Sequence, residues 1–167
     1  SCHIETGPGK LEHEWYLDIS GKNPVRALAE KLVKVLGRDG PIFVYSGYEK
    51  AVLNKLAFIF PDLERPVQKI VDRLVDLLPW VRSHYYHPEM MGSCSIKYVL
   101  PTVAPELKYD ELEEVQDGSG AQMAFLEAID PSTESSRKIA IENNLKKYCG
   151  LDTMAMVKLV HFFQGGG

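Results

Sequence analysis

Few cysteines and no long hydrophobic run occur in this sequence, and each shortage excludes a class of protein. The three cysteines, Cys2, Cys94 and Cys149, are odd in number and far apart, so they provide neither a disulfide framework nor metal-ligand spacing. A reducing, cytoplasmic setting is therefore expected. A membrane-spanning helix needs about 20 consecutive apolar residues. No stretch of the chain approaches that length, so no membrane partner is expected.

Glycine-rich phosphate loops and an excess of positive charge are also lacking. The chain contains neither G-x-x-x-x-G-K-[ST] nor G-x-G-x-x-G, the two patterns that cradle nucleotide phosphates. Its formal net charge of -4 argues against a strongly basic surface for nucleic acid. Acidic metal ligands themselves make a chain more negative, so a nuclease site remains compatible with this charge.

What the chain does contain is the composition of an ordinary globular protein, with 45% hydrophobic and 25% charged residues in a length of 167. This length is enough to bury a substantial core. We expect a single domain over residues 1–164 and a loose glycine tail over 165–167.

The first half of the chain predicts a hairpin, a helix and a buried strand. A Gly/Pro cluster at residues 7–10 separates two strand-like runs, which is typical of a hairpin. Asn23-Pro24 provides a start signal for a helix that ends at Gly37. The short apolar run from Gly40 to Tyr45 then has the pattern of a strand buried on both faces.

An acid follows this strand directly. Glu49 falls at the junction between the buried strand and a helix predicted over residues 49–60. In open α/β sheets, sites form at the carboxyl ends of the strands. For a lone Glu, however, the position also favours a simpler role in the first turn, where a negative charge complements the helix dipole.

Further along, a second short apolar run, residues 74–78, carries Asp76. The aromatic loop that follows, from Trp80 to Tyr86, has a composition more typical of packing than of a nucleic-acid groove. His84 and His87 lack a third metal ligand nearby. Lys97, on a short helix predicted over residues 92–101, either contacts a phosphate backbone or is simply solvated.

The final helical region carries Tyr148 and Asp152, four residues apart and therefore on one helix face. That face also carries apolar residues, so it is expected to point inward. A buried Asp is costly unless it is paired, hydrogen-bonded or bound to metal. The alternative is that Asp152 caps a local break at Gly150. This stretch alone favours neither interpretation.

Carboxylates at the end of a central strand and on a late helix form the arrangement that a two-metal phosphodiester site needs. Such oxygen ligands suit Mg²⁺ or Mn²⁺. The chain resembles the RNase H-like DEDD 3′–5′ exonucleases, whose last motif, Tyr-x-x-x-Asp, matches Tyr148 to Asp152. The resemblance implies that Asp152 binds metal and that Tyr148 orients the attacking water.

The middle exonuclease motif places an aromatic and an acid just after the central strand, and Tyr48-Glu49 resembles it. The resemblance makes Glu49 a catalytic metal ligand. Asp76 is either a supporting group near it or an exposed acid at a strand end, and Ser46 is a second candidate for a supporting role. The match departs from the family pattern in two places. The acid is Glu rather than Asp, and Ser46 stands in place of an upstream Asn, one residue closer.

The first exonuclease motif, Asp-x-Glu on the first strand, has no counterpart before the Gly7 turn. We expect that strand to lie upstream of Ser1. The fold class expected is therefore α/β, an RNase H-like mixed sheet flanked by helices that lacks its first strand. Such a fragment is expected to be incomplete and inactive.

The chain also resembles a bacterial family of domains of unknown function, number 2779. That resemblance implies an RNase H-like domain, often found in larger proteins that carry a RecB-like nuclease domain, which makes such a domain an expected partner. The segments that carry the resemblance are Tyr48–Lys50, Arg73–Leu77, Tyr86–Pro88, Gly92–Pro101, Tyr109–Leu112, Asp117-Gly118 and Tyr148–Met156.

The sequence therefore predicts a metal-dependent 3′–5′ exonuclease-like domain that acts on DNA or RNA. Its catalytic residues would be Glu49, Tyr148 and Asp152, and Lys97 would contact nucleic acid. The alternative is a non-catalytic RNase H-like module that binds nucleic acid or a partner nuclease domain.

Overall fold

The computed structural model describes residues 1–37, 39–107, 115 and 118–165, and these divide into two compact units. Unit 1 comprises Ser1–Lys22 and Leu100–Gly167, and unit 2 comprises Asn23–Val99. Each unit combines helices with a two-stranded sheet, so the mixed α/β class is confirmed. The RNase H-like arrangement and the single domain over 1–164 stay predictions. Among the described residues, every helix is too short or too polar to cross a membrane.

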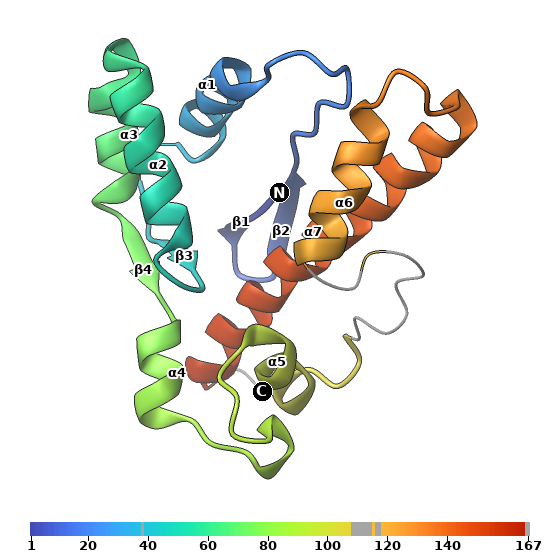
Figure 1. Cartoon of the computed structure of the whole chain (residues 1–167). Helices are drawn as coiled ribbons and strands as arrows, with labels where there is room; N and C mark the ends of the chain where they lie inside the picture. The colour runs from blue at the N-terminus through green and yellow to red at the C-terminus, as the bar shows by residue number, and fades with distance from the viewer. Residues whose placement is uncertain (38, 108–114, 116–117, 166–167) are drawn as a thin grey trace. The chain divides into compact units, whose positions relative to one another are not determined.

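Unit 2 is built around two short parallel strands (Figure 1). The chain leaves the first strand, crosses through two helices and returns to form the second, with Val44 opposite Asp76 in the register. The two crossover helices lie side by side and bury a core of Leu53, Val67 and Ile70. The elements of unit 2 are α1 (Val25–Val35), β3 (Ile42–Val44), α2 (Tyr48–Ile59), η1 (Pro61–Leu63), α3 (Glu64–Val71), β4 (Leu74–Asp76), α4 (Leu78–His84) and η2 (Pro88–Met90).

A single arginine fastens the connection between α1 and β3. The guanidinium of Arg73, just before β4, donates hydrogen bonds to the backbone carbonyls of Leu36, Gly37, Asp39 and Gly40, and to that of Lys69, at 2.7–3.2 Å. Gly37 has a φ of 60°, which turns the chain at the end of α1 and presents its carbonyl to this group. One side chain therefore satisfies the carbonyls of a connection that is in neither a helix nor a strand.

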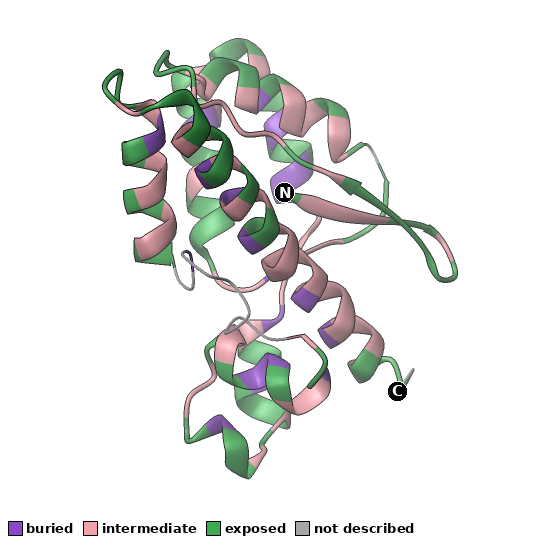
Figure 2. Ribbon diagram, turned by 90° about the vertical axis from the view of Figure 1, so that its right-hand side faces the viewer, coloured by how far each residue is buried: buried purple, intermediate pink, exposed green. Residues whose placement is uncertain are grey.

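Unit 1 contains an antiparallel hairpin and two helices, and the longer helix contacts both the hairpin and the shorter helix. The buried residues of this long helix recur along one side, where Figure 2 shows them in purple. The elements are β1 (Cys2–Gly7), β2 (Lys10–Glu14), α6 (Gly118–Ile129) and α7 (Ser135–Phe163), and the sequence boundary between the units falls within α5 (Ile96–Val103).

Polar contacts fix the hairpin to α7. His3 Nδ1 lies 2.9 Å from Thr153 Oγ1, and His161 Nε2 donates to Glu5 Oε2 at 3.0 Å. Gly150 makes the close approach possible, because a Cβ at this position would lie 3.3 Å from the His13 ring. A side chain at 150 would therefore require the His13 ring to shift slightly.

Several sequence predictions are settled by these elements. The hairpin, the first helix, the buried strand and the helix that begins near Glu49 are confirmed. The prediction of a loop from Trp80 to Tyr86 was wrong over most of that range, because residues 78–84 form α4. The break at Gly150 was also wrong, since α7 continues through it. Part of the predicted glycine tail lies outside the described residues.

Candidate functional site

The carboxyl ends of the parallel strands carry two acids. Asp76 is the last residue of β4, directly opposite Val44, and Glu49 lies in the first turn of α2 just after β3. Partial burial raises the pKa of Glu49, and the nearby Asp76 carboxylate raises it further, while a backbone hydrogen bond opposes both effects. Glu49 is an exposed residue overall, and its carboxyl group is only partly shielded from water. The charge of Asp76 at the end of β4 therefore acts on Glu49 just after β3.

The connection from β3 to α2 is strained. Ser46 has a φ of 134°, a region that residues other than glycine rarely adopt. Its Oγ accepts a hydrogen bond from Tyr48 N at 3.3 Å, which helps hold the turn that leads to Glu49. Strain of this kind persists where the surrounding structure imposes it, and it concentrates at functional sites. The structure thus places Ser46 as a residue that shapes the loop carrying the acid.

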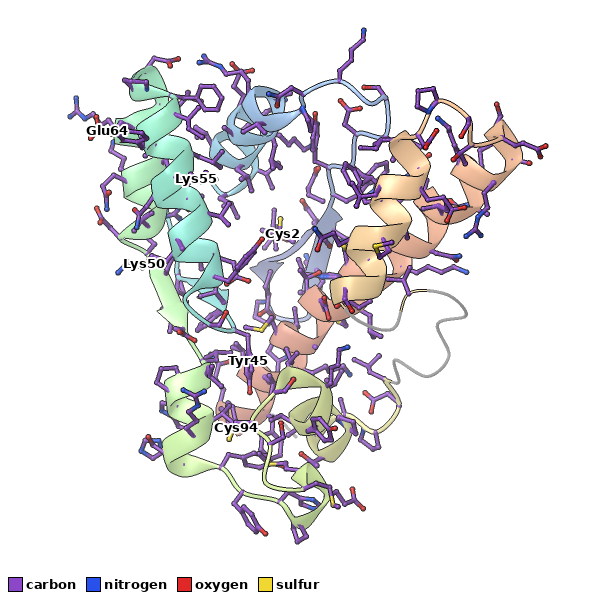
Figure 3. All side chains as sticks on the ribbon, viewed as in Figure 1. Cys2, Tyr45, Lys50, Lys55, Glu64 and Cys94 are labelled. Atoms are coloured by element: carbon purple, nitrogen blue, oxygen red, sulfur yellow. The ribbon has the colours of Figure 1, made fainter. Side chains whose placement is uncertain are left out.

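Tyr45 is a member of this site that the sequence did not single out. Its hydroxyl donates a short hydrogen bond, 2.6 Å, to the carbonyl of Cys94, and Figure 3 shows the two residues next to each other. Burial raises the pKa of Tyr45 to about 12, with a smaller contribution from Asp76. The proton therefore stays on the hydroxyl, and the bond ties the end of β3 to the turn before α5.

In unit 1, α7 presents the other two predicted residues. Tyr148 is buried, with 8% of its surface exposed, and Asp152 lies one turn further along and is half-buried. The charge of Asp152 reaches Cys149, whose pKa is raised mainly by burial and in part by this carboxylate. The inward orientation is thus confirmed for Tyr148 and holds in part for Asp152.

A cavity of about 300 Å³ lies on the same side of unit 1 as Cys149. Trp15 and Phe125 line it, and Lys146 Nζ stands 3.7 Å from the centre of the Trp15 ring. Sequence periodicity gave no sign of this cavity, because its walls come from the segment after β2, from α6 and from α7. Its lining is mostly apolar, which suits packing or an apolar ligand better than a metal ion.

The structure groups the predicted site residues by unit. Glu49, Asp76 and Ser46 belong to unit 2, and Tyr148 and Asp152 belong to unit 1. Among residues 1–37, 39–107, 115 and 118–165, no group of three or more His, Cys, Asp and Glu side chains is arranged to hold a metal ion. Mg²⁺, however, is commonly held by one or two carboxylates together with water and substrate phosphate. The pair of Glu49 and Asp76 fits that smaller donor set.

Lys97, the predicted nucleic-acid contact, lies in the first turn of α5 and is half-buried. It follows Cys94 by three residues, so the hydrogen bond from Tyr45 holds the backbone immediately before it. This hydrogen bond therefore ties the backbone before Lys97 to Tyr45, the residue that follows β3.

Residues 1–95 match the model of the family described as domain of unknown function (DUF2779). The match covers more than half of the 167 residues, so the chain belongs to this family. It includes the whole strand-end site of unit 2 and stops before Lys97 and α7. No curated protein and no solved structure matches the chain.

Proposed function

We propose that this member of the DUF2779 family is an RNase H-like, metal-dependent 3′–5′ exonuclease domain acting on DNA or RNA. One observation carries the proposal: Glu49 in the first turn of α2 and Asp76 at the end of β4 lie at the carboxyl ends of two parallel strands, where burial and, to a smaller extent, the charge of Asp76 raise the pKa of Glu49. Two carboxylates held together in this way favour the binding of a cation. Tyr148 and Asp152 on α7, in unit 1, are included in the proposal because they match the last motif of the exonucleases.

Each residue has a distinct role in this proposal. Glu49 and Asp152 would each supply a carboxylate ligand for Mg²⁺ or Mn²⁺, and Asp76 would support Glu49 by adding negative charge near it. When bound, the metal supplies Lewis-acid polarisation of the phosphate and lowers the pKa of a water molecule. The hydroxyl of Tyr148 orients the attacking water through a hydrogen bond. Tyr148 is suited to this role because its burial fixes the ring.

The test is cleavage of a 5′-labelled single-stranded oligonucleotide by the full natural polypeptide in Mn²⁺. A ladder that shortens from the 3′ end is expected, and a 3′ phosphorothioate should block it. Glu49→Gln and Asp152→Asn should each lower the rate at least about a hundredfold, since even residues that only support metal ligands account for 10- to 100-fold effects. Glu64→Gln is the matched control, an exposed acid in the first turn of α3.

A non-catalytic module that binds nucleic acid or a partner nuclease domain is the second candidate. It is favoured by the lack of a three-ligand metal group among the described residues. Under this alternative the wild-type protein binds the oligonucleotide but leaves it intact, and Glu49→Gln has no effect on affinity. Cleavage that disappears in both acid variants and persists in Glu64→Gln would exclude this second candidate.

A further inference from the structure

The segment from residue 78 to residue 98 exposes an unusual set of side chains for an acidic protein. Trp80 is 43% exposed, Tyr86 76% and Tyr98 48%, so these rings are largely available to a ligand. The packing role that the sequence favoured for the aromatic loop is therefore wrong for Tyr86, whereas Trp80 is partly exposed and stacks on His84. We call residues 78–98, which comprise α4, η2 and the start of α5, the aromatic segment.

Charge distinguishes the aromatic segment from the rest of the chain. It contains two basic residues, Arg82 and Lys97, and one acid, Glu89, whereas the whole chain carries a net charge of -4. Exposed rings interleaved with basic groups fit a ligand that has both flat faces and negative charges.

The ring of Trp80 is held in place by its neighbour His84. Trp80 stacks on His84 with ring centres 4.9 Å apart, and His84 Nδ1 lies 3.1 Å from the Trp80 carbonyl oxygen. A fixed indole loses little conformational freedom when a base stacks on it. Two hydrogen bonds anchor the segment to the ends of β4 and β3. Leu78 N donates to Asp76 Oδ1 at 2.9 Å, and Tyr45 Oη donates to the Cys94 carbonyl.

We propose that the aromatic segment is a stacking platform for single-stranded nucleic acid. Trp80, Tyr86 and Tyr98 contact bases, while Arg82 and Lys97 contact phosphates. Every base has a flat face, so stacking of this kind tolerates any sequence. The inference rests on the proposed function in one respect, that the substrate is a nucleic acid, and it extends that function by naming single strands and the surface that binds them.

The experiment measures binding alone, without metal, so its failure is distinct from a failure of cleavage. A dye-labelled oligothymidine of about 12 nucleotides, within the range that such platforms bind, is titrated with the full chain in EDTA while its fluorescence anisotropy is followed. Trp80→Ala and Tyr86→Ala should each weaken binding about five- to tenfold. Phe58→Ala is the matched control, because Phe58 is 87% exposed but lies on α2.

The phosphate contacts have a separate readout in the salt dependence of binding. Arg82→Ala should reduce the slope of log affinity against log salt by about 0.7, the value for one phosphate of a single strand. Lys55→Ala is the control; Lys55 is an exposed cation on α2, labelled in Figure 3. Equal slopes for Arg82→Ala and the wild type would overturn the phosphate assignment.

A conservative variant and a spectroscopic signal separate contact from a loss of folding. Trp80→Phe keeps a flat ring and should bind within about twofold of the wild type. In a Trp15→Phe background Trp80 is the remaining tryptophan, and its fluorescence should be quenched by the oligonucleotide. The proposal is overturned if the wild type does not bind, if Trp80→Ala binds as the wild type does, or if Phe58→Ala loses as much affinity.

Discussion

Glu49 and Asp76 in unit 2 are brought together by the register of two parallel strands, whereas Tyr148 and Asp152 in unit 1 are brought together by one turn of a single helix. The first arrangement depends on residues far apart in the sequence, and the second depends on spacing alone. The two groups of proposed site residues therefore differ in the structural change that would separate their members. A shift in strand pairing would separate Glu49 from Asp76, while the α7 pair survives as long as the helix does.

The largest expected effect comes from core substitutions that destabilise one unit at a time. Ile70→Ala in unit 2 and Leu159→Ala in unit 1, at residues that are 1% and 0% exposed, should each lower the free energy of unfolding by about 2–5 kcal/mol. Trp80 and Trp15 report on unit 2 and unit 1 respectively. In single-tryptophan backgrounds, urea denaturation followed by fluorescence should show Ile70→Ala moving the Trp80 transition more.

The same experiment also has an outcome that would contradict independent unfolding of the two units. If Ile70→Ala and Leu159→Ala shift the Trp15 and Trp80 transitions by equal amounts, the two units unfold as one cooperative body. The distinction between a register-dependent half and a helix-dependent half would then have no consequence for stability.

A smaller effect is expected at Arg73, which serves only unit 2. Arg73→Ala should lower the free energy of unfolding by about 2–3 kcal/mol, because several backbone carbonyls lose a charged donor. Arg73→Lys should recover only part of this, since an ammonium group lacks the planar fork of a guanidinium. Arg65→Ala, an exposed arginine on α3, should change stability by less than about 0.5 kcal/mol. If the Arg73→Lys protein were as stable as the wild type, the planar guanidinium group would not be required.

Tyr45 allows a finer test within the strand-end site. Tyr45→Phe should lower the free energy of unfolding by about 1 kcal/mol, the net value of one hydrogen bond. Ultraviolet titration should show that the variant lacks the tyrosine with a pKa of about 12. Tyr86→Phe, at an exposed ring, should leave stability unchanged. A Tyr45→Phe protein as stable as the wild type would mean that the contact with Cys94 is dispensable.

The smallest effect concerns the pH dependence of unit 1. Burial, and then the charges of His13 and the N-terminus, lower the pKa of His3 from 6.5, so the unfolded chain binds more protons in this range. The contribution of His3 is fully present above about pH 6.5 and is lost as the pH falls towards the lowered value. Between pH 7.5 and 5, urea midpoints followed at Trp15 should decrease, and His3→Asn should flatten that decrease.

His87→Asn, a histidine in unit 2, serves as the control for the pH series. Glu5 does not interfere above pH 5, because its hydrogen bond from His161 lowers its pKa from 4.5 and its carboxylate stays ionised there. A decrease of the same steepness in the wild type and in His3→Asn would assign the pH dependence to other groups.

Sequence reasoning predicted the parts of the molecule that local patterns encode. The Gly/Pro cluster at 7–10 gave the hairpin, the apolar run after Gly40 gave β3, and the spacing of Tyr148 and Asp152 put them on one helix face. These predictions depend on residues close in the chain, where backbone preference and periodicity decide the outcome.

The rest could not be predicted because it depends on how distant segments meet. Nothing local indicates that Asp76 stands opposite Val44, or that the guanidinium of Arg73 reaches the connection after α1. The exposure of Trp80 was missed for a related reason, since an aromatic-rich run has the same composition on a surface as in a core.

The discontinuity of unit 1 has a consequence for the newly made chain. The ribosome releases the β1–β2 hairpin before its partner α7, with all of unit 2 in between. At about 5–20 residues per second, the hairpin waits on the order of ten seconds for that helix. An isolated two-stranded hairpin is at best marginally stable in water. Unit 2, which is continuous, can fold during this interval, so the nascent hairpin is the segment most in need of chaperone protection.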